Sequence, residues 1–166
     1  IYNKRNEILD KESVHEDVLE SMKNHVVDIV ESHLDEKDNL KEEDKKDIID
    51  YINNNLLRNK VKEKELEDKN VDEIISLLSD KVVNEYENKI KDLPIEITNE
   101  FEKVISLNVI DKYWMEQITT MSHLMEGIVL RQYAQDNPLR AYTMEGYDLY
   151  EKMLENIDKY ITLYLL

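Results

Sequence analysis

The clearest hydrophobic pattern lies in the last third of the chain, where two stretches with helical periodicity flank a short polar segment. The first stretch carries two sets of apolar residues in heptad spacing: Leu107, Trp114, Met121 and Ile128, and Val104, Ile118 and Met125. The second stretch repeats apolar residues every three or four positions: Tyr147, Tyr150, Leu154, Ile157, Ile161 and Tyr164. Such spacing is typical of two helices packed along one seam.

The polar segment between these stretches, residues 131–141, contains Pro138 and is short enough to permit only an antiparallel reversal. We therefore expect a stiff two-helix prong with Tyr133 near its tip. The first helix should begin near Pro94, because a proline without an N–H suits a first helical turn. If it continues to Leu130, it spans about 55 Å at about 1.5 Å per residue. We expect the structural seam of the prong to consist of Trp114, Met121, Ile128, Tyr150 and Leu154.

The rest of the chain also favours helices. Apolar residues gather on one face in four shorter stretches, 1–9, 14–34, 48–57 and 71–90. Residues 35–47 and 61–70 are highly charged, and we expect residues 35–47 to form a solvated loop that runs into a helix start. Only two glycines and two prolines are present, so turn chemistry is scarce. We predict an all-α fold.

Composition narrows the possible partners. The formal net charge is -16, which argues against a nucleic-acid partner and against adhesion to anionic lipid. The acidity is concentrated in residues 31–73, which hold 15 acidic and 9 basic side chains, against 4 and 3 in residues 111–140. No apolar run approaches the ~20 residues of a membrane-spanning helix. Cysteine is absent, which fits a reducing compartment and excludes a disulfide framework.

Catalytic and metal-binding motifs are weak. Glycine occurs only at Gly127 and Gly146, too few to build a phosphate-binding loop, so the chain alone should not hydrolyse ATP. His15, His25 and His33 are ten and eight residues apart, whereas metal ligands on one helical face are three or four apart. We interpret the histidines as surface or boundary residues and expect neither a metal nor a cofactor in this chain.

Within the prong, residues 108–153 resemble the two-helix finger near the C-terminal end of SecA, the ATPase that drives preproteins through the Sec channel. The matching residues are Ile110, Asp111, Trp114, Gly127, Ile128, Leu130, Arg131, Tyr133, Ala134, Gln135, Pro138, Tyr142, Glu145 and Met153. Residues 1–10 resemble the long scaffold helix of that family. The resemblance implies three parts: the end of the scaffold helix (1–13), a small inserted helical wing (14–93), and the helical scaffold with its finger (94–166), whose tip is 131–141.

The resemblance also implies a function. The chain would be an excised part of an ATP-driven translocase motor that pushes unfolded preproteins through a SecY-type channel. The motor domains, which would bind ATP and Mg²⁺, would lie before Ile1 in the same protein. The implied location is the cytoplasm of a bacterium, peripheral at the membrane and reaching it only through the channel or missing segments. Because residues 137–150 look most like the cyanobacterial and plastid branch, an apicoplast-like plastid stroma is the alternative.

For individual residues, the resemblance implies roles that compete with plainer ones. The tip residues that would contact the preprotein are Tyr133, Gln132, Ala134 and Gln135. Tyr133 could instead pack back on the prong as a cap. Arg131 and Arg140 could contact the channel or the motor, or could simply complement a helix dipole. Trp114 suits a core anchor, with a contact to channel or motor as the alternative.

Two other function classes compete with the translocase. One is a stand-alone acidic helical adaptor that binds partner helices, which the sequence disfavours because the seam residues are matched in pairs within the chain. The other is a metal-binding helical bundle, which the histidine spacing disfavours.

Overall fold

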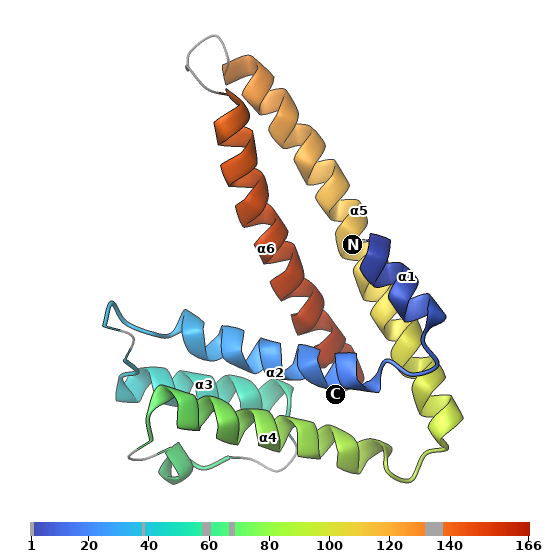
Figure 1. The fold of residues 1–166 in the computed structure, drawn as a ribbon. Helices are drawn as coiled ribbons and strands as arrows, with labels where there is room; N and C mark the ends of the chain where they lie inside the picture. The colour runs from blue at the N-terminus through green and yellow to red at the C-terminus, as the bar shows by residue number, and fades with distance from the viewer. Residues whose placement is uncertain (1, 38, 58–60, 67–68, 132–137) are drawn as a thin grey trace.

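The computed structural model describes residues 2–37, 39–57, 61–66, 69–131 and 138–166, and within them all regular secondary structure is helical (Figure 1). The elements are α1 (Tyr2–Asp10), α2 (His15–Ser32), α3 (Glu42–Asn55), the short 3-10 helix η1 (Glu63–Leu66), α4 (Val71–Ile90), α5 (Ile95–Arg131) and α6 (Pro138–Leu165). This confirms the all-α prediction. None of the described helices is both long enough and apolar enough to cross a membrane.

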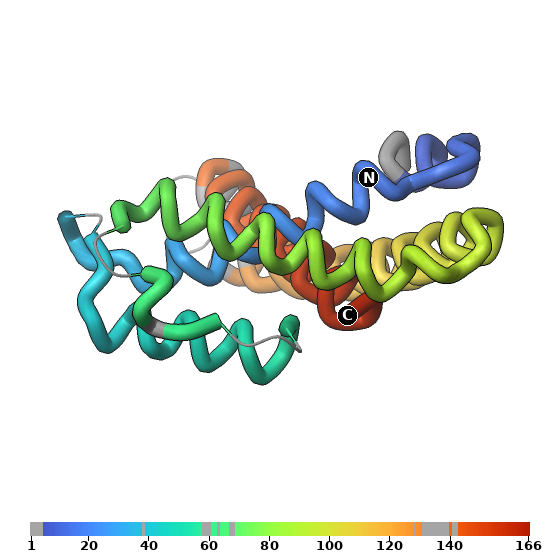
Figure 2. The backbone as a smooth tube through the Cα atoms, turned by 90° about the horizontal axis from the view of Figure 1, so that it is seen from below, coloured from blue at the N-terminus to red at the C-terminus, as the bar shows by residue number. Residues whose placement is uncertain are grey.

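The helices form two groups (Figure 1). Helices α5 and α6 make a long antiparallel pair that converges toward the Arg131 end of α5. Helices α2, α3 and α4 form a small layer at the other end of the pair, and α1 lies against α5. Figure 2, seen from below, shows α4 as the helix of this layer nearest the viewer, running toward the start of α5. Helix α2 joins the two groups, because it packs against both α4 and α6.

Local sequence explains the shorter helices. Helix α2 buries Val18, Met22 and Val26, which are four residues apart and so share one face. Helix α4 begins after Asn70, whose side-chain oxygen accepts a hydrogen bond from the backbone N–H of Glu73 at 2.8 Å. Such a cap satisfies one of the four N–H groups that a helix start leaves without partners.

One apolar core runs through the small layer and into the base of α6. Its members from α2, α3, α4 and α6 include Met22, Val26, Ile48, Ile52, Leu78, Val82 and Ile157, all 0% exposed. Full burial of one such side chain stabilises the fold by about 1.5–3 kcal/mol. The base of the long pair is therefore anchored in the same core as the layer of short helices.

The long helix has the predicted length of 37 residues, although it begins just after Pro94, whose carbonyl accepts from Thr98 N at 3.1 Å. The placement of Pro138 within the connecting loop is wrong, because Pro138 is the first residue of α6. A proline fits a helix start since its missing N–H would have no helical partner there. The division at 13/14 and 93/94 stays a prediction.

Candidate functional site

The prong is built from α5 and α6, and an apolar groove runs along it. The groove has a volume of about 680 Å³ and is lined by Trp114, Gln117, Ile118, Met121, Ser122 and Met125 of α5 and by Gly146 and Tyr150 of α6. None of these eight side chains is charged. The two helices are in close contact at Gly146, where an added Cβ would lie 2.9 Å from Met121 Cε. The absence of a side chain at Gly146 thus lets Met121 pack on the α6 backbone.

The predicted seam residues lie along this interface to different depths. Trp114, Met121 and Leu154 are half-buried, and Trp114 and Leu154 pack against the main core. Tyr150 is 39% exposed and sits at the rim of the groove. Ile128 is in α5, but its side chain lies outside the described residues.

The second set of heptad positions is only partly buried, although Ile118 and Met125 line the groove. Val104, Ile118 and Met125 of α5 are 44–47% exposed, and Tyr147 and Tyr164 of α6 are more than half exposed. A strict heptad drifts by about 20° per repeat around a straight helix, so seven-residue spacing cannot keep two sets facing one partner over 37 residues. The expectation that all seam residues are paired within the chain is therefore wrong for these positions.

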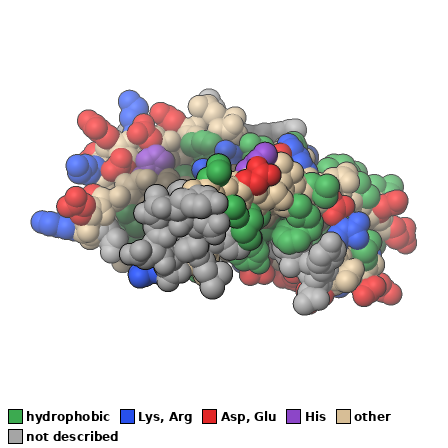
Figure 3. All heavy atoms as spheres, turned by 90° about the horizontal axis from the view of Figure 1, so that it is seen from above, with side chains coloured by type: hydrophobic (Ala, Val, Ile, Leu, Met, Phe, Trp, Pro, Cys, Tyr) green, Lys and Arg blue, Asp and Glu red, His purple; other side chains and the backbone are tan. Residues whose placement is uncertain are grey.

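The tip residues Tyr133, Gln132, Ala134 and Gln135 lie outside the described residues. Arg131 is the last residue of α5, with its side chain also outside that description, and Arg140 is exposed in the first turn of α6. Beside the tip, Leu130 is 74% and Met144 is 59% exposed. Figure 3 views the molecule from this end and shows hydrophobic side chains across the middle of the face.

A tyrosine cluster braces the lower part of the pair, and sequence reasoning missed it. The rings of Tyr113 on α5 and Tyr160 on α6 stack with centroids 5.4 Å apart, and Tyr164 lies 5.9 Å beyond Tyr160. Burial, followed by the hydrogen bond with Tyr160, raises the pKa of Tyr113 to about 12. An aromatic pair of this kind contributes about 0.5–1.5 kcal/mol beyond its buried area. Its only sequence signal was the spacing of Tyr160 and Tyr164, one turn apart.

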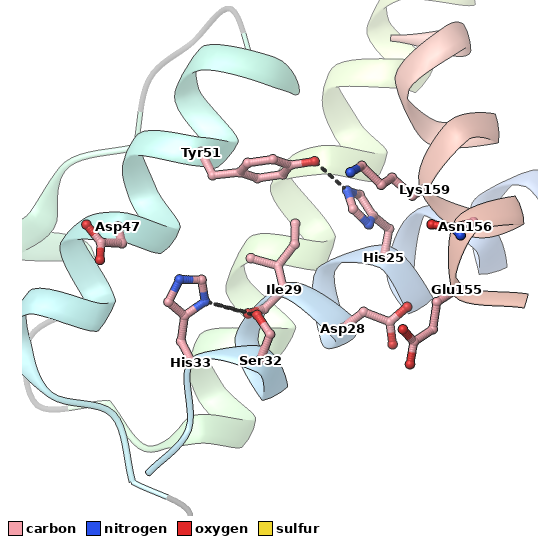
Figure 4. A pocket seen from close by; sticks show the side chains of 10 residues that line it. All are labelled: His25, Asp28, Ile29, Ser32, His33, Asp47, Tyr51, Glu155, Asn156 and Lys159. Carbon is pink, nitrogen blue, oxygen red and sulfur yellow. Dashed lines mark hydrogen bonds between the residues drawn. The ribbon is translucent and has the colours of Figure 1, made fainter. Parts of the chain in front are cut away.

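A second, polar pocket of about 390 Å³ lies where α2, α3 and α6 meet (Figure 4). On its wall His25 is 4% exposed, and its Nε2 lies 3.0 Å from the Tyr51 hydroxyl. Burial, and then the charge of Lys159, lowers the pKa of His25 to about 4. His25 is therefore a neutral, hydrogen-bonded part of the core at pH 7, and its interpretation as a surface or boundary residue is wrong.

Opposite His25, acidic side chains of α2 and α6 face each other. Figure 4 shows the carboxylates of Asp28 and Glu155 pointing toward one another across the two helices. Burial raises the pKa of Asp28 to about 6, with further contributions from Glu155, Asp158 and Glu31. Burial and neighbouring like charges both disfavour ionisation of a carboxyl group, so this end of the α2–α6 contact is electrostatically unfavourable at neutral pH.

The histidines have separate partners and do not converge. His15 lies beside Glu102, His25 beside Tyr51, and His33 Nδ1 lies 2.8 Å from the carbonyl of Ile29. In the part of the chain that the structure describes, no group of three metal-ligating side chains could hold an ion. The described geometry is that of two braced helices anchored in a helical base.

Comparison with protein families agrees with this architecture. The family described as the SecA wing and scaffold domain matches residues 1–166, which is the whole chain. The match includes the layer of short helices. An all-helical chain with a long braced pair, matched over its full length, belongs to the SecA wing and scaffold family.

Proposed function

We propose that the α5–α6 pair is the finger of a protein translocase and that the segment around Tyr133 contacts the unfolded preprotein at the mouth of a SecY-type channel. As a SecA wing and scaffold domain, the chain is a component of a SecA-type protein translocase. The observation that carries the proposal is α5, a single helix of 37 residues that begins beside the core of the short helices and ends at Arg131.

Stiffness supports this proposal. A helix alone bends, but α5 is paired with α6 along the groove, at the Tyr113–Tyr160 stack and at the close approach of Met121 to Gly146. The base of α6 is buried in the main core through Ile157 and Ile161. A displacement of the base would therefore be carried to the far end rather than absorbed by bending.

In this proposal, the neighbours of Tyr133 have supporting roles. Gln132, Ala134 and Gln135 would offer polar and small contacts around a ring that can pack on many kinds of side chain. Arg131 and Arg140, at the facing helix ends, would contact the channel or the motor.

The wider setting is proposed as well. Motor domains of the same protein would bind ATP and Mg²⁺ and move the scaffold, and the membrane would be reached through the channel. The compartment would be a bacterial cytoplasm or a plastid stroma.

The test uses the absence of cysteine from this chain. In the complete translocase with other cysteines removed, a single cysteine is placed at Tyr133 and tested for crosslinking to a preprotein stalled in its channel. Matched single cysteines replace Thr120 on the exposed side of α5 and Ser76 on α4. We expect an ATP-dependent and channel-dependent crosslink at Tyr133 and none at Ser76.

A translocase that stalls normally, crosslinks at a motor site and gives no product at Tyr133 would contradict the proposal. Tyr133 would then be a cap of the prong, and α5–α6 would brace the scaffold only. Equal crosslinking at Tyr133 and Thr120 would mean that the preprotein lies along the shaft rather than at its tip.

A further inference from the structure

The segment from α2 to α4 joins the rest of the chain through two crossings. The chain enters this segment at Lys11–Val14, between α1 and α2, and leaves it at Lys91–Pro94, between α4 and α5. We call residues 15–90 the α2–α4 unit. Near these two crossings, one polar side chain of α2 and one of α4 contact the same carboxylate of α5.

This carboxylate belongs to Glu102, which lies two turns into α5 and is 0% exposed. The Tyr86 hydroxyl, from the last turns of α4, donates to Glu102 Oε2 at 3.0 Å. His15 Nδ1, at the first residue of α2, lies 3.0 Å from the same oxygen and 3.4 Å from Oε1. Because a carboxylate oxygen only accepts, this imidazole nitrogen carries the hydrogen. We call these three residues the Glu102 clasp.

Two further contacts close the clasp. His15 Nε2 lies 3.8 Å from the carboxylate of Glu87, the residue after Tyr86 on α4. The rings of His15 and Tyr86 stack with centroids 6.3 Å apart. The start of α2 and the end of α4 are thus tied to each other as well as to α5. Burial, followed by the neighbouring Glu102, raises the pKa of Tyr86, so its hydroxyl keeps the proton that it donates.

The energetics of such a buried polar junction favour a role in orienting the α2–α4 unit over a role in stabilising the fold. Removing a carboxylate from water is costly, and apolar residues of similar volume often stabilise a protein as well or better. Hydrogen bonds are directional, whereas apolar contacts are not. The hydrogen bonds among these three side chains therefore leave little freedom in the angles between the helices that carry them. A buried polar junction at the two crossings therefore restricts how the α2–α4 unit is set on α5.

We propose that the Glu102 clasp is a conformational lock that holds the α2–α4 unit at one angle to the long helix α5. Without it, apolar packing would keep the unit folded and attached but would allow a range of orientations. The inference concerns the base of the pair and is independent of what the tip contacts.

The test measures orientation and stability separately. The apolar variant His15→Leu/Tyr86→Phe/Glu102→Met removes every polar group of the clasp at once, leaving none unpaired. The matched control is Thr98→Val, one turn earlier on α5, where the buried hydroxyl has no hydrogen-bond partner among the described residues. Spin labels on cysteines at Ser76 and Thr120 report the distance between α4 and α5 in the complete translocase. A second pair, at Thr120 and Lys152, reports the α5–α6 pair.

We expect the apolar variant to broaden the distance distribution between positions 76 and 120, leave that between 120 and 152 unchanged, and keep its melting temperature. Thr98→Val should leave both distributions narrow. A narrow, unshifted 76–120 distribution in the apolar variant would overturn the proposal, because apolar packing alone would then set the angle.

If the triple variant does not fold, Tyr86→Phe alone decides the question, since it removes only the donor from α4. Broadening of the 76–120 distribution in that variant supports the clasp, and no change overturns it. Neither result depends on the crosslink at Tyr133, so failure of the clasp and failure of the finger proposal are distinguishable.

Discussion

At the residue scale, Tyr133 and Trp114 have different roles in the proposed function. Tyr133 has no seam position to fill, since it follows Leu130, the last apolar residue of the long helix pattern. Its aromatic ring and hydroxyl suit contact with an unspecified polypeptide. Trp114, in contrast, is half-buried against the main core, which fits the anchor that the sequence predicted.

We predict that Tyr133→Ala in the complete translocase lowers preprotein translocation strongly, while basal ATPase activity and helix content remain near those of the parent. The reason is that the substitution removes the aromatic ring proposed to contact the preprotein, at a position that follows the last apolar residue of the long helix pattern. Tyr133→Phe is the matched control and should retain most activity, because the ring makes the non-specific contact. Translocation rates, ATPase rates and far-ultraviolet circular dichroism measure the three quantities. Unchanged translocation in Tyr133→Ala would refute the tip role.

At the scale of the elements, the α5–α6 pair leaves different amounts of room around the two glycines of its helices. The two glycines of the chain illustrate the difference. A Cβ on Gly127 would meet nothing within 4 Å, whereas one on Gly146 would meet Met121 Cε at 2.9 Å. Both residues are inside helices, where glycine costs about 0.5–1 kcal/mol relative to alanine.

We therefore predict that Gly127→Ala raises the free energy of unfolding by about 0.5–1 kcal/mol. Gly146→Ala should gain less, because the flexible end of Met121 must move. Gly146→Val should lose about 1–3 kcal/mol, as overpacking forces the helices apart. Urea unfolding of the three variants measures these differences. An equal gain at both alanine variants would mean that α5 and α6 do not approach closely at Gly146.

At the scale of the whole molecule, the polar pocket between α2, α3 and α6 gives stability a pH dependence with two opposing parts. Asp28 has a folded pKa of about 6, raised from 3.8, so on lowering the pH its carboxylate binds a proton in the folded state before it does in the unfolded state. This group therefore destabilises the fold above pH 6, and the penalty fades as the pH falls from about 6 to 3.8. His25 has a folded pKa of about 4, lowered from 6.5, so its effect has the opposite sign. Stability from His25 is lost as the pH falls from 6.5 to 4.

We predict that Asp28→Asn stabilises the domain by about 1 kcal/mol at pH 7.5, a value reduced from the full pKa shift because the carboxylate is partly exposed to solvent. The gain should disappear at pH 4, where the parent Asp28 is protonated. Urea unfolding at both pH values measures it, with the exposed Asp50→Asn as the control for net charge. A gain of the same size at both pH values would show that burial and the neighbouring carboxylates do not destabilise ionised Asp28.

Much of this organisation can be predicted from the sequence, because it depends on local periodicity. Helical spacing predicted the long helix, which ends at Arg131, and its antiparallel partner, and the spaced residues around Trp114 indicated the family that the full-length match confirms. Apolar spacing identifies which face of a helix avoids water. It cannot identify the partner of that face, and the heptad pattern therefore overestimated the burial of Ile118 and Met125.

Only the tertiary structure decided which side chains from distant parts of the chain meet. Glu102 lies between Phe101 and Lys103 in a stretch that reads as half-exposed helix, yet its carboxylate is fully buried, and Phe101 is 50% exposed. Tyr113 and Tyr160 stack although 46 other residues separate them along the chain. Periodicity is a property of one helix, whereas these contacts depend on how several helices pack together. The sequence by itself therefore determined the helices and the family, and the packing of α2, α4, α5 and α6 decided the clasp, the aromatic brace and the acidic pocket.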